Sequence, residues 1–261
     1  MAQTGTMAVI RCDFFSDVLE LGTSMTVLLP QSPSAQIGLA GHGGDAPPPV
    51  LYLLHGLSDD DTAWTRYTSI ERYAAARGLA VVMPQVHRSF YTDEAHGGRF
   101  WTFLSQELPA VVSGFFRVST QRADTFVAGL SMGGYGAFKW ALRQPDRFAA
   151  AASLSGALDV ASIYRQPYTN EVAARVFGDR PVAGTDDDLL HVLTTVDPAR
   201  VPRLMVRCGT EDHLVEQNHR FVAACGERGV PLEVEFGPGA HEWSYWDAQI
   251  QAVLDWLPVG V

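Results

Sequence analysis

Residues 125–144, TFVAGLSMGGYGAFKWALRQ, decide the fold of this chain. The first six of them, residues 125–130, are mostly apolar, β-branched or aromatic, which is typical of a buried strand. From Gly134 onward the apolar residues recur at helical spacing, until Pro145 ends the run. The sequence therefore predicts a strand that turns sharply into a helix, with Ser131 at the turn.

Glycines flank this serine in the pattern G-x-S-x-G, with Gly129 before it and Gly133 after it. Residues without a β-carbon let a strand and a helix pass closely at a strained turn, which exposes the serine hydroxyl. At the beginning of a helix the backbone N–H groups lack partners, so the N–H of Met132 is a candidate oxyanion donor. The alternative is a glycine-rich strand end in which the serine only caps the helix.

Composition indicates a globular protein and argues against a nucleic-acid or membrane partner. With 261 residues, 47 % of them hydrophobic, the chain is long enough for a single α/β domain, which we expect over residues 1–261. The net charge of −10 and the lack of a Lys/Arg-rich run argue against nucleic acid and anionic membrane as partners.

The cysteines and the N-terminus predict a cytoplasmic protein. Cys12, Cys208 and Cys225 are widely spaced and include no C-x-x-C pair, so we expect free thiols. The first ten residues lack a basic segment followed by an apolar one, and no apolar run is long enough to span a bilayer.

Strand and helix patterns alternate along most of the chain, which predicts parallel crossover units in an α/β fold with helices on both faces of the sheet. An antiparallel pair is expected at the sheet edge, over residues 9–15 and 23–29. Later strands are expected at 50–54, 79–83, 125–130, 148–154, 203–207 and 232–236, with helices at about 64–77, 103–116, 214–228 and 243–257 and one after Ser131. Two segments interrupt the alternation: a flexible Gly/Pro link at residues 31–49 and a lid-like insertion at residues 157–200.

A serine nucleophile needs a base, and the base needs an acid to orient it. In this architecture they follow in the order serine, acid, histidine, each after a strand at the carboxyl edge of the sheet. Asp212 follows residues 203–207 and His241 follows residues 232–236, so they are the predicted acid and base. The local alternatives are a helix cap for Asp212 and a solvated loop histidine for His241.

A second oxyanion donor is expected after the strand at 50–54, where the sequence reads H-G-L-S. The backbone N–H of Leu57 is the candidate, and an ordinary glycine turn is the alternative. The chain has no H-E-x-x-H or comparable ligand spacing, so we expect neither a metal nor a cofactor.

The chain resembles the esterase family that contains bacterial tributyrin esterases, esterase D and S-formylglutathione hydrolases, and is most similar to the tributyrin esterase branch. The resemblance rests on motifs in order between Val50 and Trp256: YLLHGLS, VVMP, YTD, ELP, AGLSMGGYGA, LSGAL, CGTED and AHEW-x-YWD. It implies the α/β-hydrolase fold and a triad of Ser131, Asp212 and His241. The family's oxyanion donors fall on the backbone amides of Leu57 and Met132.

Small-molecule esters with short acyl chains are the substrates that this resemblance implies. Tyr91 and Trp101 are the aromatic candidates for an acyl pocket, although aromatic residues in such loops also serve simple packing. S-formylglutathione hydrolases carry a cysteine soon after the oxyanion loop, whereas this chain has Ser58-Asp59-Asp60-Asp61. A thioesterase of that type, a carbohydrate-directed acetyl or feruloyl esterase and a non-catalytic binding protein stay as alternatives, and a homo-oligomer is left open.

Overall fold

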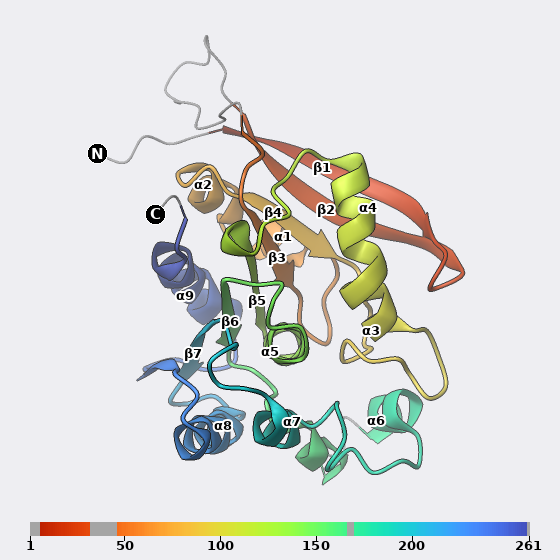
Figure 1. Ribbon diagram of the computed structural model, residues 1–261, viewed down its shortest axis with the longest axis vertical. Coiled ribbons are helices and arrows are strands. Elements are labelled where there is room, and N and C mark those ends of the chain that lie inside the picture. The colour runs from red at the N-terminus through yellow and green to blue at the C-terminus, as the bar shows by residue number, and fades with distance from the viewer. Residues whose placement is uncertain (1–5, 32–45, 166–169, 260–261) are drawn as a thin grey trace.

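The computed structural model describes residues 6–31, 46–165 and 170–259, which surround a mixed sheet of eight strands in the order β1-β2-β4-β3-β5-β6-β7-β8 (Figure 1). β1 pairs antiparallel with β2 and β2 with β4, whereas β4, β3, β5, β6, β7 and β8 are parallel neighbours. The strands are β1 Thr6–Ser16, β2 Leu21–Gln31, β3 Val50–Leu54, β4 Ala80–Pro84, β5 Thr125–Leu130, β6 Ala150–Leu154, β7 Arg203–Gly209 and β8 Glu233–Gly237. Both the mostly parallel sheet and the antiparallel pair at its edge are confirmed.

Helices cover both faces of this sheet. Side chains that alternate along a central strand therefore point to opposite faces and are buried on each. In β3, Leu51 and Leu53 pack with α1, α2 and α9, while Val50, Tyr52 and Leu54 join the cluster beneath α4, α5, α7 and α8 (Figure 1). The α-helices are α1 Ala63–Tyr67, α2 Ile70–Ala75, α3 Phe100–Thr102, α4 Leu108–Phe115, α5 Met132–Arg143, α6 Asn170–Phe177, α7 Leu189–Thr195, α8 Val215–Arg228 and α9 Trp243–Trp256.

The helix predicted at 64–77 is in fact two short helices, α1 and α2. The Thr68 hydroxyl donates to the Trp64 carbonyl at 2.5 Å, and the Ser69 N–H donates to the Asp247 carboxylate at 3.2 Å. These hydrogen bonds replace the helical backbone bonds between α1 and α2. Serine and threonine hydroxyls often compete with helical hydrogen bonds in this way.

The helix predicted at 103–116 contains Pro109, and the structure shows how the proline is accommodated. A π-helical turn, Phe103–Glu107, connects α3 to α4 and places Pro109 in the first turn of α4. A proline cannot donate to the carbonyl four residues earlier, which belongs to Ser105. Arg147 donates to that carbonyl at 3.3 Å instead.

The two segments that interrupt the pattern differ in how much of them is described. Residues 32–45 of the predicted link lie outside the described residues. The insertion at 157–200 contains α6, α7 and a 3-10 turn, Val160–Arg165, and its residues 166–169 are not described. Across the described parts of the chain, no helix combines the length and apolar character needed to cross a bilayer.

Candidate active site

Ser131 lies at the turn between β5 and α5, in a strained backbone conformation with φ 53° and ψ −118°. Backbone hydrogen bonds hold the turn on both sides. The Ser131 N–H donates to the Leu154 carbonyl at 2.9 Å, and the Ser131 carbonyl accepts from the Ala157 N–H at 3.0 Å. A strained non-glycine residue held this firmly marks a functional site.

The flanking glycines are required by close approach of the chain to itself. A β-carbon on Gly133 would lie 2.4 Å from the Leu54 carbonyl oxygen, and one on Gly129 would lie 2.4 Å from the backbone of Gly133. Neither contact is possible for a real side chain, so G-x-S-x-G follows from the packing of β5, α5 and the end of β3.

The predicted serine, acid and histidine come together at the carboxyl edge of the sheet. His241 Nε2 lies 3.0 Å from Ser131 Oγ, and His241 Nδ1 lies 2.8 Å from Asp212 Oδ2. The three side chains come from the turn after β5, the loop after β7 and the loop after β8. Such a chain of hydrogen bonds allows the imidazole to take a proton from the hydroxyl while the carboxylate orients it.

Asp212 is 2 % exposed and keeps its charge through its partners. Burial raises the pKa of this carboxyl, but the hydrogen bonds from His241 and from the Leu214 N–H outweigh burial and hold the pKa below its usual value. The buried group is therefore an ionised acceptor, as the orienting acid requires.

Leu57 lies in the loop after β3, and the peptide groups before it are fixed by hydrogen bonds. The His55 carbonyl accepts from the Tyr91 hydroxyl at 2.9 Å, and the Gly56 N–H donates to Asp59 Oδ2 at 3.2 Å. Among the described residues no partner is found for the Leu57 N–H, which lies next in the chain. Met132 is the first residue of α5, so its N–H also has no partner within the helix.

His55 braces the same loop as a neutral side chain. Its Nε2 accepts from the Val86 N–H at 3.2 Å, so its Nδ1 carries the proton and donates to the Gly56 carbonyl at 2.8 Å. Burial lowers the pKa of His55. His55 thus braces the loop before Leu57, in the role that its place before Gly56 suggests.

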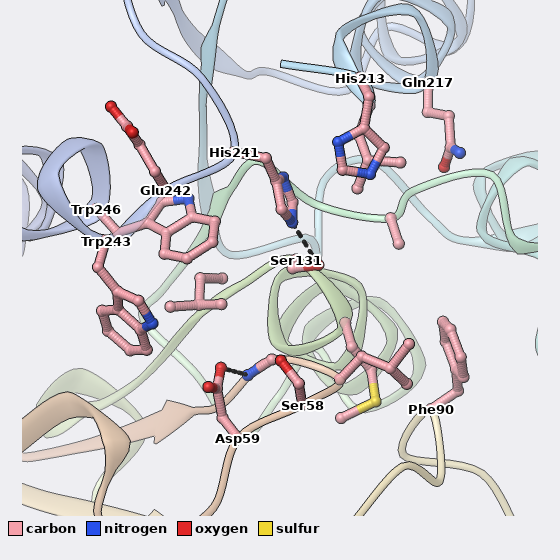
Figure 2. Close-up of a pocket in the computed structure, with 16 residues that line it drawn as sticks. Ser58, Asp59, Phe90, Ser131, His213, Gln217, His241, Glu242, Trp243 and Trp246 are labelled. Carbon is pink, nitrogen blue, oxygen red and sulfur yellow. Dashed lines mark hydrogen bonds between the residues drawn. The ribbon is translucent and has the colours of Figure 1, made fainter. Parts of the chain in front are cut away.

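Ser131 opens into a cavity of about 510 Å³. Figure 2 shows His241 over Ser131, with His213 and Gln217 to one side and Trp243 and Trp246 to the other. The lining residues are Gly56, Leu57, Ser58, Asp59, Phe90, Leu130, Ser131, Met132, Ala157, His213, Leu214, Gln217, His241, Glu242, Trp243 and Trp246. Both predicted oxyanion residues are among them.

Tyr91 and Trp101 do not line this cavity, which corrects the prediction of their role. Tyr91 is fully buried, with its ring against Gly136 and its hydroxyl on the loop of Leu57. Trp101 borders a different hollow, where its ring lies 4.2 Å from the guanidinium carbon of Arg143. The aromatic lining comes instead from Phe90, Trp243 and Trp246.

His213, the residue after the predicted acid, lines the cavity and packs edge-to-face on His241, with 4.5 Å between the ring centroids. Burial and the adjacent His241 lower its pKa. Among the described residues, Asp212, His213 and His241 are close enough together to offer three ligand atoms to a metal ion. Two of these side chains are already engaged in the hydrogen-bonded chain to Ser131.

Comparison with known proteins gives a consistent result for the family and the fold. The model of the family described as "Putative esterase" matches residues 25–257. The acetyl esterase of Caldicellulosiruptor saccharolyticus is 28% identical over 263 residues, which cover 96% of this chain and 98% of the relative.

Two solved structures from Staphylococcus aureus superpose closely on this chain. FphF, a fluorophosphonate-binding serine hydrolase, has a TM-score of 0.89 at 34% identity and covers 97% of this chain and 99% of its own. The S-formylglutathione hydrolase FrmB has a TM-score of 0.85 at 34% identity with the same coverage. The chain belongs to this esterase family and is a carboxylic ester hydrolase with the α/β-hydrolase fold.

Proposed function

We propose that this protein is a serine carboxylesterase that hydrolyses short-chain acyl esters through an acyl-enzyme on Ser131. The observation that carries the proposal is the unbroken hydrogen-bonded chain from buried Asp212 through His241 to Ser131, at the wall of a cavity. Ordinary packing gives no reason for a half-buried serine with a strained backbone to face a cavity beside a histidine oriented by a buried carboxylate.

The reaction proceeds in two steps. Ser131 Oγ attacks the ester carbonyl while His241 Nε2 takes the hydroxyl proton, and His241 then returns that proton to the departing alcohol. Water attacks the resulting acyl group with His241 again as the base, which releases the acid and restores Ser131. The ionised Asp212 stabilises the imidazolium in both steps.

The negative oxygen of each tetrahedral intermediate is assigned to the N–H groups of Leu57 and Met132. Both residues line the cavity beside Ser131. Fixed donors of this kind contribute about 3 kcal/mol each to the lowering of the barrier, because they need no reorganisation when the charge forms.

A short acyl group suits the apolar part of the lining. Leu57, Phe90, Leu130 and Met132 line the cavity together with Ser131, and the acetyl esterase relative supports acetyl esters as substrates. A series of p-nitrophenyl esters from acetate to laurate, run beside Ser131→Ala, tests the proposal. We expect kcat/KM to fall for long chains and Ser131→Ala to remove most of the rate, and comparable turnover by the variant would place the nucleophile elsewhere.

An acetylated sugar is a second candidate substrate, favoured by one observation. The Tyr67 side chain is 49% exposed and its ring lies 4.9 Å from that of Trp243, which lines the cavity. Exposed aromatic rings at a site entrance suit stacking on a sugar face. Faster turnover of acetylated xylose than of tributyrin would favour this candidate, and the reverse order would favour simple esters.

We also propose a cytoplasmic location and a single domain over residues 1–261, with residues 157–200 as a lid-like insertion. Cys12, Cys208 and Cys225 are free, which suits a reducing compartment. Alkylation of the protein under denaturing conditions as the cells are lysed, followed by mass spectrometry, tests the location. Three alkylated cysteines are expected, whereas fewer would indicate an oxidised protein.

A further inference from the structure

The charged side chains that line the cavity are all acidic. Asp59 and Glu242 are acidic, and none of the described lining residues is a lysine or an arginine. Figure 2 shows Asp59 beside Ser58, and Glu242 where α9 begins, with its carboxylate turned away from Ser131. The exposed Glu242 carboxylate accepts from the Ser244 hydroxyl at 2.8 Å. A substrate that enters this cavity therefore meets the carboxylate of Asp59, and the exposed Glu242 adds negative charge at longer range.

Asp59 is held in place next to the reacting groups. Its Oδ2 accepts from the Gly56 N–H at 3.2 Å, one residue before the proposed oxyanion donor Leu57. Burial raises the pKa of Asp59. The assays below are therefore set at pH 8, well above the usual pKa of a carboxyl group, so that the side chain carries its charge. At that pH His213, whose pKa is lowered, is neutral and does not offset the charge.

Cations on the neighbouring elements are already paired with other carboxylates. Arg66 of α1 lies 3.1 Å from Asp60, and Arg220 of α8 lies 2.8 Å from Asp159. Neither guanidinium lines the cavity. A carboxylate on a substrate would therefore be desolvated beside Asp59 without a partner, which is costly.

We propose that this site selects neutral or cationic esters and rejects esters and thioesters that carry a carboxylate close to the scissile bond, with Asp59 and Glu242 as the residues that impose the selection. This inference rests on the proposed function, because it concerns the substrate of the same serine.

Two near-isosteric substrates measure the selection. 4-Acetoxybenzamide and 4-acetoxybenzoate share the acyl group and the ring and differ in one charge. Each kcat/KM is divided by the rate constant of the same ester with free imidazole, which corrects for the difference in intrinsic reactivity. At pH 8 and low salt we expect the corrected kcat/KM to be about tenfold higher for the amide, since the Asp59 carboxylate acts at short range and Glu242 adds to its field. High salt is expected to reduce the ratio, because screening weakens a charge effect and leaves a steric one unchanged.

Variants assign the selection to its residues. Asp59→Asn keeps an acceptor for the Gly56 N–H, and Glu242→Gln keeps the side-chain shape. In the double variant we expect the substrate ratio to fall to about a third or less of the wild-type value, whatever happens to the absolute rates. Glu227→Gln removes the same charge from an exposed position on α8 and is expected to leave the ratio unchanged.

The outcomes separate this inference from the proposed function. If both substrates are turned over with a corrected ratio near one, or if the ratio is unaffected by salt and by the double variant, the charge selection is wrong while the esterase stands. If neither substrate is hydrolysed in a Ser131-dependent reaction, the proposed function itself fails. A ratio that collapses equally in Glu227→Gln would show an effect of net charge rather than of the cavity, and would overturn the assignment to Asp59 and Glu242.

Discussion

Tyr91 shows how one buried side chain supports the proposed chemistry without touching the substrate. Its hydroxyl donates to the His55 carbonyl at 2.9 Å, and its ring fills the space that glycine leaves at position 136. The hydroxyl thereby fixes the peptide group between His55 and Gly56. The N–H of Leu57 belongs to the next peptide group in the chain. Tyr91 is accordingly a positioning residue.

Tyr91→Phe keeps the ring and removes only this hydrogen bond. We expect kcat for p-nitrophenyl acetate to fall about tenfold with little change in KM, because a displaced oxyanion donor weakens binding of the transition state alone. Tyr73→Phe is the matched control, since it removes a tyrosine hydroxyl bound to Asp247, away from the cavity. A loss of thermal stability without a loss of kcat would show that Tyr91 is structural only.

Sequence order was enough to predict the three side chains that form the hydrogen-bonded chain, but it did not assign Tyr91 its place. Ser131, Asp212 and His241 each follow a strand with a clear pattern, so the sheet itself brings them to one edge. The loop of Tyr91 has consecutive positive φ angles, 50° at both Phe90 and Tyr91. That backbone turns Phe90 toward the cavity and Tyr91 into the core, which no residue pattern in the loop indicates.

The turn from β5 into α5 is the element on which the site depends. Gly133→Ala would place a β-carbon 2.4 Å from the Leu54 carbonyl oxygen, so the helix must move away from β3. We expect the variant to lose most of its esterase activity and about 2 kcal/mol or more of its free energy of unfolding, measured by urea denaturation.

Gly226→Ala in α8 is the control for this substitution, because no heavy atom lies within 4 Å of the added β-carbon. In a helix interior the same change is expected to stabilise the protein by about 0.5–1 kcal/mol and to leave the activity intact. Equal behaviour of the two variants would refute the close-approach explanation of the G-x-S-x-G pattern.

The elements themselves were predictable to the extent that local signals control them. Continuous apolar runs gave β3 and β5 with their observed ends, because strands buried on both faces have no polar positions. The break between α1 and α2 depends on Asp247, a residue of α9 that is far away in sequence. Contacts of that kind cannot be read from local periodicity.

Across the whole molecule, Lys139 joins the helix behind the nucleophile to the insertion at 157–200. Its ammonium is fully buried, lies 2.6 Å from Asp187 and donates to the Tyr91 carbonyl and the Thr92 hydroxyl. Burial lowers the pKa of Lys139 to about 8, against the opposing effect of Asp187. This ion pair therefore ties three parts of the chain together at a cost in desolvation.

Lys139→Met leaves three polar partners without a donor. We expect a loss of about 3 kcal/mol or more in the free energy of unfolding at pH 7, measured by urea denaturation. Arg200→Met breaks the exposed pair with Asp146 and is expected to have no measurable effect. If both variants lost similar amounts of unfolding free energy, burial would not explain how much each ion pair contributes to stability.

The pH dependence of the Lys139→Met effect follows from the lowered pKa. Between about pH 8 and the usual lysine pKa of about 10.4, the unfolded chain holds a proton that the folded chain has released. The free energy of unfolding of the wild type therefore rises with pH relative to the variant, by at most about 1.4 kcal/mol per unit. A difference that shrinks from pH 7 to pH 9.5 would contradict the lowered pKa.

Covalent labelling of Ser131 tests the proposed mechanism without assuming a natural substrate. The protein is treated with the phosphorylating agent diethyl p-nitrophenyl phosphate, which loses p-nitrophenolate on reaction, and the modified peptide is identified by mass spectrometry. We expect one phosphoryl group on Ser131, loss of esterase activity in proportion to labelling, and much slower labelling of His241→Ala. Modification at another residue, or full activity with Ser131 modified, would contradict the assignment of Ser131 as the nucleophile.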